Sequence, residues 1–326
     1  MANMVPSRFG QVNGDGDARA LFLKLFSGLV LAQFSTKTVA RSRQLVRSIT
    51  SGKSAQFPVI GKGGAGYHTP GVQLVGTGVP SNERVISLDD ALIADRFVAN
   101  IDEAISHFEI RSEYAKDAGD ALAQAFDRNS LQVMTLAARA GAAVSGGNGG
   151  TVIEAGEDVT DTAASLVAAI ATANTALDEK DVPEEDRACF LRPAVYQKLI
   201  ESGHDAINAD YNREPNGSIA SGKIFRIGGT ELVKTNNLPN TDVDSGPTGY
   251  QGDFTDTVAT VAHRSAAGVA MLWDIATEME YLIEYQGTLL VAKMAVGHGI
   301  LRPESAVEIQ AVDPESPGGG EGGGEG

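Results

Sequence analysis

Residues 51–84 read SGKSAQFPVIGKGGAGYHTPGVQLVGTGVPSNER, with two short apolar runs, at 57–60 and 72–75, around a glycine-rich centre. The segment has no helical periodicity, and connections longer than roughly 12–15 residues are uncommon inside a compact domain. Its valine, isoleucine and phenylalanine content argues against plain disorder. The segment therefore predicts an extended two-stranded arm that reaches away from its own core. Because an isolated hairpin is marginal in water, we expect this arm to rest on a neighbouring copy of the chain.

The N-terminal side of this segment predicts a second arm. Asp17 can cap a helix that runs to about Phe34, and residues 37–50 suit a strand or a further piece of the arm. Residues 21–34 (LFLKLFSGLVLAQF) are apolar but shorter than the roughly 20 residues that cross a bilayer. Acidic residues precede them in place of the basic start of a signal peptide. We therefore expect a buried helix that docks the arm, and no membrane partner.

On the C-terminal side, residues 111–140 predict one long helix. Apolar and small side chains recur there at spacings of three and four, in a stripe made of Ala118, Leu122, Ala125, Asn129, Val133, Leu136 and Ala140. Thirty helical residues would span about 45 Å, which is long for a globular protein. The pattern predicts a structural spine that ends at Gly141.

The rest of the chain predicts a mixed α and β body. Residues 85–110 return to the compact domain, with apolar side chains at Leu92, Ile93, Phe97, Ile101 and Ile105. Residues 151–262 predict an α/β unit with a helix from Asp161 to Leu177, a strand at 187–191, a helix at 193–200 and a hairpin from 224–227 and 231–234. Further strands are predicted at 267–273, 278–285, 289–296 and 307–312, before a flexible Gly/Glu tail.

Charge is unevenly distributed along the chain. Residues 1–90 carry 10 Lys/Arg against 5 Asp/Glu, whereas residues 91–326 carry 16 against 37. A basic segment and an acidic body on one chain suit contact between copies. The alternative is a solvated basic arm. The single cysteine, Cys189, lies in an apolar run and predicts a buried thiol rather than a nucleophile.

No motif in the chain predicts catalysis, a cofactor or a metal. Residues 61–66 (GKGGAG) match a dinucleotide pattern, but Pro70 and Gly71 follow where a phosphate-binding helix should begin. Residues 52–54 (GKS) end like a P-loop, but Arg47 stands where its first glycine should be. The five histidines show no metal-ligand spacing. These absences and the long arm indicate a structural role.

Four segments resemble the major capsid proteins of T-seven-type short-tailed phages. They are residues 47–59 (RSITSGKSAQFPV), 111–114 (RSEY), 263–266 (HRSA) and 297–304 (GHGILRPE). The first and fourth are specific, and their order and spacing also fit. The resemblance covers most of residues 17–310, although 142–260 match only in general pattern and the Gly/Glu tail departs from the family.

This resemblance implies an α+β protein of the Hong Kong 97 capsid fold. Its parts map to an N-terminal arm (1–50), an extended loop (51–84), a peripheral domain (85–141 and 263–312, with the spine at 111–140) and an axial domain (142–262), followed by a tail (313–326). The implied contact residues between subunits are Arg47, Lys53, Phe57, Lys62, Tyr67, Arg84, Arg111, Glu113, Arg264, Arg302 and Glu304. Of these, Arg47, Lys53 and Arg84 are the candidates for charge pairing with an acidic neighbour, or else are solvated.

The same resemblance implies a shell of hexamers and pentamers around double-stranded DNA, built in the cytoplasm of a bacterial host and kept in the virion. It further implies a scaffolding protein during assembly, a portal protein at one vertex, and DNA contacted without sequence specificity. Three alternatives stay open on the sequence: an encapsulin-like nanocompartment shell, a soluble α/β enzyme that uses residues 151–262, and a tail or decoration protein.

Overall fold

The computed structural model describes residues 20–71, 73–74, 76, 78–99, 110–201, 217–218, 223–224 and 226–312. Its helices are α1 (Ala20–Lys37), α3 (Ile110–Arg139), α4 (Ala163–Glu179) and α5 (Pro193–Glu201), with short 3-10 turns η1 (Arg41–Arg43), η2 (Glu157–Thr160), η4 (Thr248–Tyr250), η5 (Ile283–Tyr285) and η6 (Pro303–Ser305). Its strands are β1 (Leu45–Ser48), β2 (Ser54–Ile60), β3 (Ser81–Ser87), β4 (Leu92–Ala99), β5 (Thr151–Glu154), β6 (Arg187–Leu191), β7 (Gly217–Ser218), β8 (Lys223–Ile224), β9 (Arg226–Ile227), β10 (Thr230–Lys234), β11 (Asp242–Val243), β12 (Gly252–Asp253), β13 (Thr257–His263), β14 (Ala267–Leu282), β15 (Gly287–Ile300) and β16 (Ala306–Gln310).

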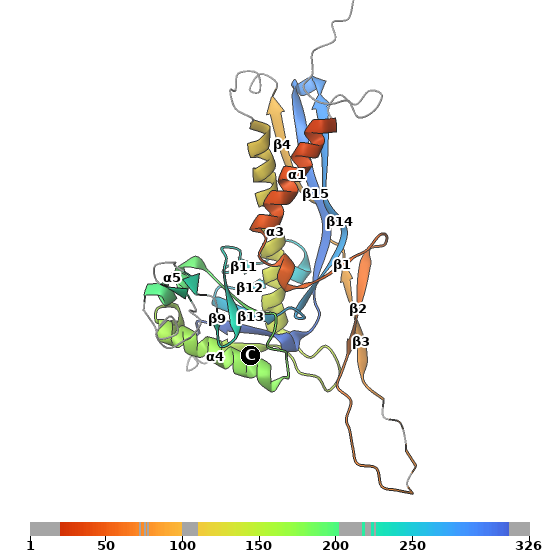
Figure 1. The fold of residues 1–326 in the computed structure, drawn as a ribbon, viewed down its shortest axis with the longest axis vertical. Coiled ribbons are helices and arrows are strands. Elements are labelled where there is room, and N and C mark those ends of the chain that lie inside the picture. The colour runs from red at the N-terminus through yellow and green to blue at the C-terminus, as the bar shows by residue number, and fades with distance from the viewer. Residues whose placement is uncertain are drawn as a thin grey trace, which may run out of the picture.

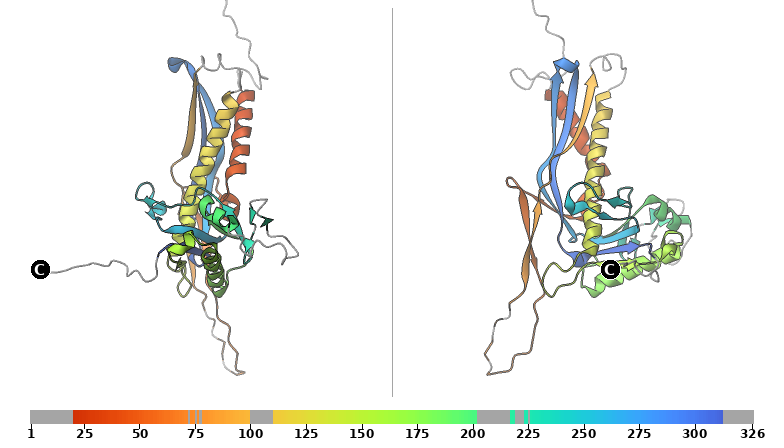
Figure 2. Two further views of the ribbon diagram at one scale, coloured as in Figure 1. Left: turned by 90° about the vertical axis from the view of Figure 1, so that its left-hand side faces the viewer. Right: turned by 180° about the vertical axis from the view of Figure 1, so that it is seen from behind.

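A four-stranded sheet runs along the upper part of the molecule in the order β1-β14-β15-β4 (Figure 1). β14 and β15 pair antiparallel from Ala267↔Ile300 to Leu282↔Gly287, and β4 joins β15 antiparallel. Helices α1 and α3 cover one face of this sheet (Figure 2, left). Alternation along β4 produces this arrangement, since Ala94 and Val98 are buried on the helical side while the residues between them are not.

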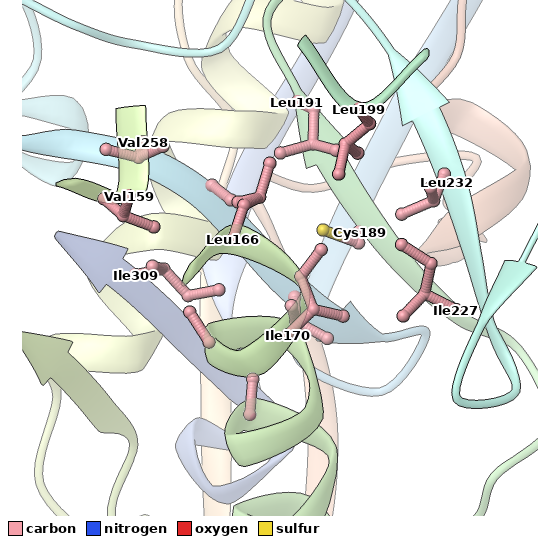
Figure 3. Close-up of a cluster of buried hydrophobic side chains, with 14 of the residues drawn as sticks. Val159, Leu166, Ile170, Cys189, Leu191, Leu199, Ile227, Leu232, Val258 and Ile309 are labelled. Atoms are coloured by element: carbon pink, nitrogen blue, oxygen red, sulfur yellow. The ribbon is translucent and has the colours of Figure 1, made fainter. Parts of the chain in front are cut away.

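A six-stranded sheet forms the lower part, in the order β5-β16-β13-β6-β10-β9. Helix α4 lies against it, and Leu166 and Ile170 of α4 point toward Cys189 and Leu191 of β6 and Ile309 of β16 (Figure 3). Cys189 is fully buried, and this burial raises the pKa of its thiol to about 12. The prediction of an inert core thiol is therefore confirmed.

Helix α3 connects the two cores. Its N-terminal half contributes Leu122 and Phe126 to the upper cluster with α1, and its C-terminal half contributes Leu131 and Met134 to a second cluster under the lower sheet. The predicted 30-residue spine is present as Ile110–Arg139. The predicted stripe describes only part of its burial, because the helix lies between several elements and is buried on more than one side.

Most predicted elements of the lower part are present, with small shifts. The strand at 187–191 and the helix starting at Pro193 are confirmed, and β9 and β10 form the predicted hairpin through Gly228 and Gly229, both at positive φ. One prediction is wrong: 267–273 and 278–285 are not separate strands. Residues 267–282 form the single strand β14, because β15 continues to pair across the intervening residues, while 283–285 form the 3-10 turn η5. Asp17, Ile101 and Ile105 lie outside the described residues.

The predicted two-stranded arm is present. β2 pairs antiparallel with β3 in a two-stranded sheet of its own, with Phe57 opposite Arg84. Within the apolar run at 72–75, the described residues 73–74 belong to no strand. The second strand, SNERVIS at 81–87, does not alternate polar and apolar residues; its burial alternates only at the end, where Ile86 is buried between the exposed Val85 and Ser87.

Candidate subunit interface

The root of the β2–β3 hairpin crosses the upper sheet at Gly297 and Gly299 of β15. A Cβ atom at Gly297 would lie 2.0 Å from the Ser87 oxygen, and one at Gly299 would lie 2.8 Å from Ile86 Cγ1. A real Cβ atom does not approach so closely, so only glycine allows β3 to pass directly over β15. The 297–304 segment that carries the family resemblance therefore fixes where the extended loop leaves the body.

His298, between these two glycines, points to the opposite side of the sheet. Its ring is buried and contacts the rings of Phe126 at 4.9 Å and Tyr250 at 6.0 Å. Its Nδ1 lies 3.1 Å from Ser130 Oγ on the spine helix. The Tyr250 hydroxyl donates to Asp89, which follows the hairpin. Alternation along β15 thus puts the loop root on one face and a polar junction on the other.

Beyond its root, the loop projects away from the body (Figures 1 and 2). Every described residue from 62 to 80 is exposed, including the apolar side chains of Tyr67, Leu74 and Val79. Leu74 is 77% exposed and Val79 is 46% exposed. Apolar side chains gathered on one projecting segment are characteristic of an interaction surface.

Three contacts hold the base of the loop against its own lower part. Val59 is buried with Val144, and Asn82 Nδ2 donates to the Ala143 oxygen at 2.7 Å. Lys62 and Asp181 form an ion pair that is exposed on both sides, and Lys62 lowers the pKa of the Asp181 carboxyl. Exposed pairs of this kind contribute little to stability. The base of the loop is therefore held mainly by the small apolar cluster.

The predicted contact residues at the loop fall into three groups. Arg47 of β1 donates to the Gln56 oxygen and lies over the Phe57 ring at 5.9 Å, so both side chains have contacts within their own subunit. Lys53 and Tyr67 are exposed. Arg84 is half-buried on β3, opposite Phe57, with its Nε atom buried and without a partner among the described residues.

The remaining predicted contact residues lie in two other places. Glu113 pairs with Lys116 one turn along the spine at 2.6 Å, while the side chain of Arg111 lies outside the described part of the structure. Arg264 lies 4.0 Å from Asp186, and Arg302 lies 3.9 Å from Glu304, so these residues meet acidic groups of their own chain. The structure does not bring the predicted residues into one site.

The uncovered face of the upper sheet was missed by sequence reasoning. Ile93 and Phe97 of β4 and Trp273 of β14 are exposed there, each by 45% or more. Tyr285, in the turn between β14 and β15, packs edge-on against Phe97 at 6.5 Å. The missed signal was the alternation at 92–99, which implies a second, half-apolar face once α1 and α3 cover the first.

The N-terminal arm docks on the spine through a close helix contact and a buried carboxylate. A Cβ atom on Gly119 would lie 2.8 Å from the Val30 oxygen of α1, so this glycine lets the two helices approach. Asp127 of α3 accepts hydrogen bonds from the Thr38 hydroxyl at 2.7 Å and from two following backbone N–H groups. Burial raises the pKa of Asp127, although these hydrogen bonds act to lower it. The expectation that 21–34 form an arm-docking helix is thereby confirmed.

The described residues show no arrangement for metal chemistry and no membrane-crossing helix. No group of three or more metal-ligating side chains occurs among them. None of their helices combines the length and apolarity needed to span a bilayer.

Comparison with known proteins identifies the family. A sequence profile described as Gp10A-like, major capsid protein, matches residues 56–310. The chain belongs to this family. It is 33% identical to the major capsid protein of Escherichia phage T7 over 320 residues, covering 89% of this chain and 92% of that one. It is 31% identical to the major capsid protein of Enterobacteria phage T3, covering 92% and 94% respectively.

Solved structures agree with the sequence relatives. The chain matches the capsid structure of cyanophage P-SCSP1u with a TM-score of 0.76 and 37% identity, over 96% of this chain and all of the other. It also has the fold of the mature capsid subunit of bacteriophage PhiM1, with a TM-score of 0.69. As a member of the Gp10A-like family, the protein forms the icosahedral shell of a phage virion and is not an enzyme. The Hong Kong 97-type fold is confirmed, and the enzyme, nanocompartment and decoration alternatives are set aside.

Proposed function

We propose that the extended loop of each Gp10A-like subunit lies across the uncovered sheet face of a neighbour, and that this contact joins subunits into the hexamers and pentamers of the shell. The observation that supports it is the projecting loop, whose described residues from 62 to 80 are all exposed. Apolar residues on a segment that packs on nothing in its own chain need a partner surface, and copies of the chain supply one.

The uncovered sheet face has the chemistry to receive this loop. It presents Ile93 and Phe97 for apolar contact, beside acidic side chains at Asp95, Glu278 and Glu280. The loop segment contributes Lys53, Lys62 and Arg84 with a single acidic residue, Glu83. Complementary charge would fix the register of the contact, while the apolar side chains would supply most of its free energy.

The subunit's own hairpin root leaves room for that contact. It occupies only the lower end of the same face, at Gly297 and Gly299. Ile93 and Phe97 pair with Lys293 and Leu289 further up the sheet, beyond the root. One loop root and one neighbouring loop could therefore share the face end to end, which is a heterologous contact that closes into rings.

The four parts of the subunit would then divide the work. The arm (1–50) would brace the spine, the extended loop (51–84) would bind a neighbour, and the peripheral domain (85–141 and 263–312) would receive that neighbour's loop. The axial domain (142–262) would gather around the centre of each ring. The remaining predicted contact residues, Arg111, Glu113, Arg264, Arg302 and Glu304, stay candidates for further contacts between subunits.

A phage shell is expected to have further partners during assembly and DNA packaging. A scaffolding protein would guide assembly in the bacterial cytoplasm, and a portal protein would occupy one vertex. The acidic body would leave packaged double-stranded DNA weakly held, since basic walls bind phosphates through counterion release. A strongly basic inner wall in an assembled particle would contradict this last point.

Sedimentation with negative-stain microscopy of the fast fraction tests the loop's role. The full chain, with a scaffolding protein co-expressed if needed, should give closed shells or regular sheets. A chain lacking residues 57–80 should stay folded and soluble but form no regular particles. A matched control replaces residues 62–79 with a Gly/Ser segment of equal length, which keeps β2 and β3 but removes the exposed apolar side chains. Normal particles from either variant would contradict the proposal.

A further inference from the structure

His298 lies where four separate parts of the chain meet. Ser130 comes from the spine, Gln44 from the arm just before β1, Tyr250 from the lower part, and Asp89 from the segment that follows β3 of the loop hairpin. The Tyr250 hydroxyl also accepts the His298 backbone N–H at 3.2 Å. The buried ring contacts the spine and Tyr250 directly, and it is linked to the arm through Ser130 and to Asp89 through Tyr250.

The hydrogen bonds around Ser130 define which ring nitrogen carries the proton. Ser130 Oγ donates to the Phe126 oxygen at 2.9 Å, so its only proton is committed. Gln44 Nε2 donates to the same Oγ at 3.1 Å. His298 must then donate to Oγ through Nδ1, which leaves Nε2 as a bare acceptor. Nε2 is buried and has no hydrogen-bond partner among the described residues.

A second proton on this ring would create a buried cation with nothing to accept its hydrogen bond. Among the described residues, the ring packs against the aromatic rings of Phe126 and Tyr250 and hydrogen-bonds the neutral hydroxyl of Ser130. Burial alone lowers the pKa of His298, to about 3. The ring can therefore gain a proton near its ordinary pKa only if the junction opens to water.

We propose that this junction is an acid-sensitive switch: acidification opens it around His298 and frees the loop root and the arm together. In the open state the imidazole is solvated and takes a proton near pH 6.5, whereas in the closed state it stays neutral. The closed state is thus fully favoured above pH 6.5 and loses that advantage as the pH falls toward 3.

The other titratable groups at the junction act in the opposite direction. Burial raises the pKa of Asp89, beside Tyr250, and of Asp127, three residues before Ser130 on the spine. A carboxyl with a raised pKa holds its proton more tightly in the closed state, so acid favours closure through these two groups. On the arm, Arg41 and Arg43 form ion pairs elsewhere, with Asp274 and Glu231. Acid opening at this junction is therefore specific to His298.

Hydrogen exchange of the full-length subunit, followed by mass spectrometry between pH 7.5 and 5, tests the switch. After correction for intrinsic exchange rates, residues 44–49, 86–90 and 248–251 should open together. Their opening equilibrium should rise about tenfold per pH unit below pH 6.5, because one proton is bound on opening. The test requires no assembly, so it does not depend on the proposed loop contact.

Two variants at His298 and one control separate the switch from general acid instability. His298→Gln keeps a donor for Ser130, and His298→Phe keeps the aromatic packing; whichever is folded at pH 7.5 should show opening that is independent of pH. The control His263→Gln changes another described histidine whose pKa burial lowers, and it should keep the tenfold slope. A flat wild-type profile, a slope that persists in both His298 variants, or a slope lost in the control would overturn the proposal.

Discussion

Helix α3 and the extended loop are similar in length but opposite in how they use their apolar residues. α3 has 30 residues, and the side chains of its C-terminal half, from Ser130 to Ala138, are buried except for the half-buried Leu136. The loop at 51–84 has Ala55 and Val59 buried at its root, while its described tip residues are exposed. The first region therefore stabilises the subunit, and the second stabilises the contact between subunits.

This difference implies that changes in the two regions should affect different measurements. A change at the spine should lower the free energy of unfolding of the isolated subunit. A change at the loop tip should leave that free energy almost unchanged and reduce the yield of particles. The following predictions test this separation, beginning with the largest expected effect on the subunit.

The largest effect should come from Arg139 at the end of the spine. Its guanidinium makes two 2.6 Å hydrogen bonds to Glu308, whose side chain is fully buried, and donates to the Asp253 oxygen. Removing one partner leaves a buried charge unpaired, so Arg139→Ala should lower the free energy of unfolding by about 3–5 kcal/mol. Urea denaturation of the subunit measures this loss. Glu113→Gln, in the exposed pair with Lys116, is the control and should change it by less than about 0.5 kcal/mol.

A smaller effect is expected where the loop root crosses the sheet. Gly297→Ala would place a methyl group on the Ser87 oxygen and push β3 off β15. Overpacking of this kind costs about 1–3 kcal/mol. Gly249→Ala, where a Cβ atom meets nothing within 4 Å, is the matched control. Equal thermal denaturation curves for the two variants would show that the crossing is looser than described.

At the contact between the arm and the spine, two Gly→Ala substitutions should change the free energy of unfolding in opposite directions. Gly119→Ala forces α1 and α3 apart, and the lost packing should exceed the gain in helix propensity, for a net loss of about 1 kcal/mol. Gly28→Ala lies on the outer side of α1, with no atom within 4 Å, and should stabilise by about 0.5–1 kcal/mol. Thermal denaturation of both variants would reveal the sign, and a stabilising Gly119→Ala would contradict the close approach.

The smallest effect on the subunit should come from the loop tip. Tyr67 is fully exposed, and Leu74 is nearly so. Replacing both with Ser should change the free energy of unfolding by no more than about 0.5 kcal/mol. The same variant should reduce the yield of particles on sedimentation several-fold, because both side chains would be lost from the contact with a neighbour. Unchanged particle yield would show that the tip carries no binding energy.

Sequence reasoning succeeded where local pattern and packing agreed. The spine, the strand at 187–191 and the helix starting at Pro193 each follow from periodicity and capping within one segment. It failed where pairing partners decide the outcome. β14 is continuous because β15 pairs along it, and the second strand of the arm is β3 at 81–87 because that segment pairs with β2, although it is less apolar than the run at 72–75.

The candidate interface shows the same division. Tyr67 and Lys53 were predicted from the loop's own composition, and both are exposed. Arg47, Lys62 and Arg302 were predicted to meet a neighbour, but each contacts its own chain in the isolated subunit. Charge along the sequence could not identify Asp181 as the partner of Lys62, because it lies 119 residues away, whereas Arg47 and Arg302 meet the nearby Gln56 and Glu304 once the local chain is folded.

The sequence by itself determined the family, the long spine and the existence of a projecting loop, because glycine content and periodicity are local properties of the chain. Only the tertiary structure decided what the two glycines around His298 do. Because they carry no side chain, they allow β3 to cross β15 directly. The His298 ring between them points to the opposite side of the sheet, toward the junction around Ser130. That outcome depends on strands crossing in space, and the free energy of such contacts belongs to pairs of segments rather than to either one alone.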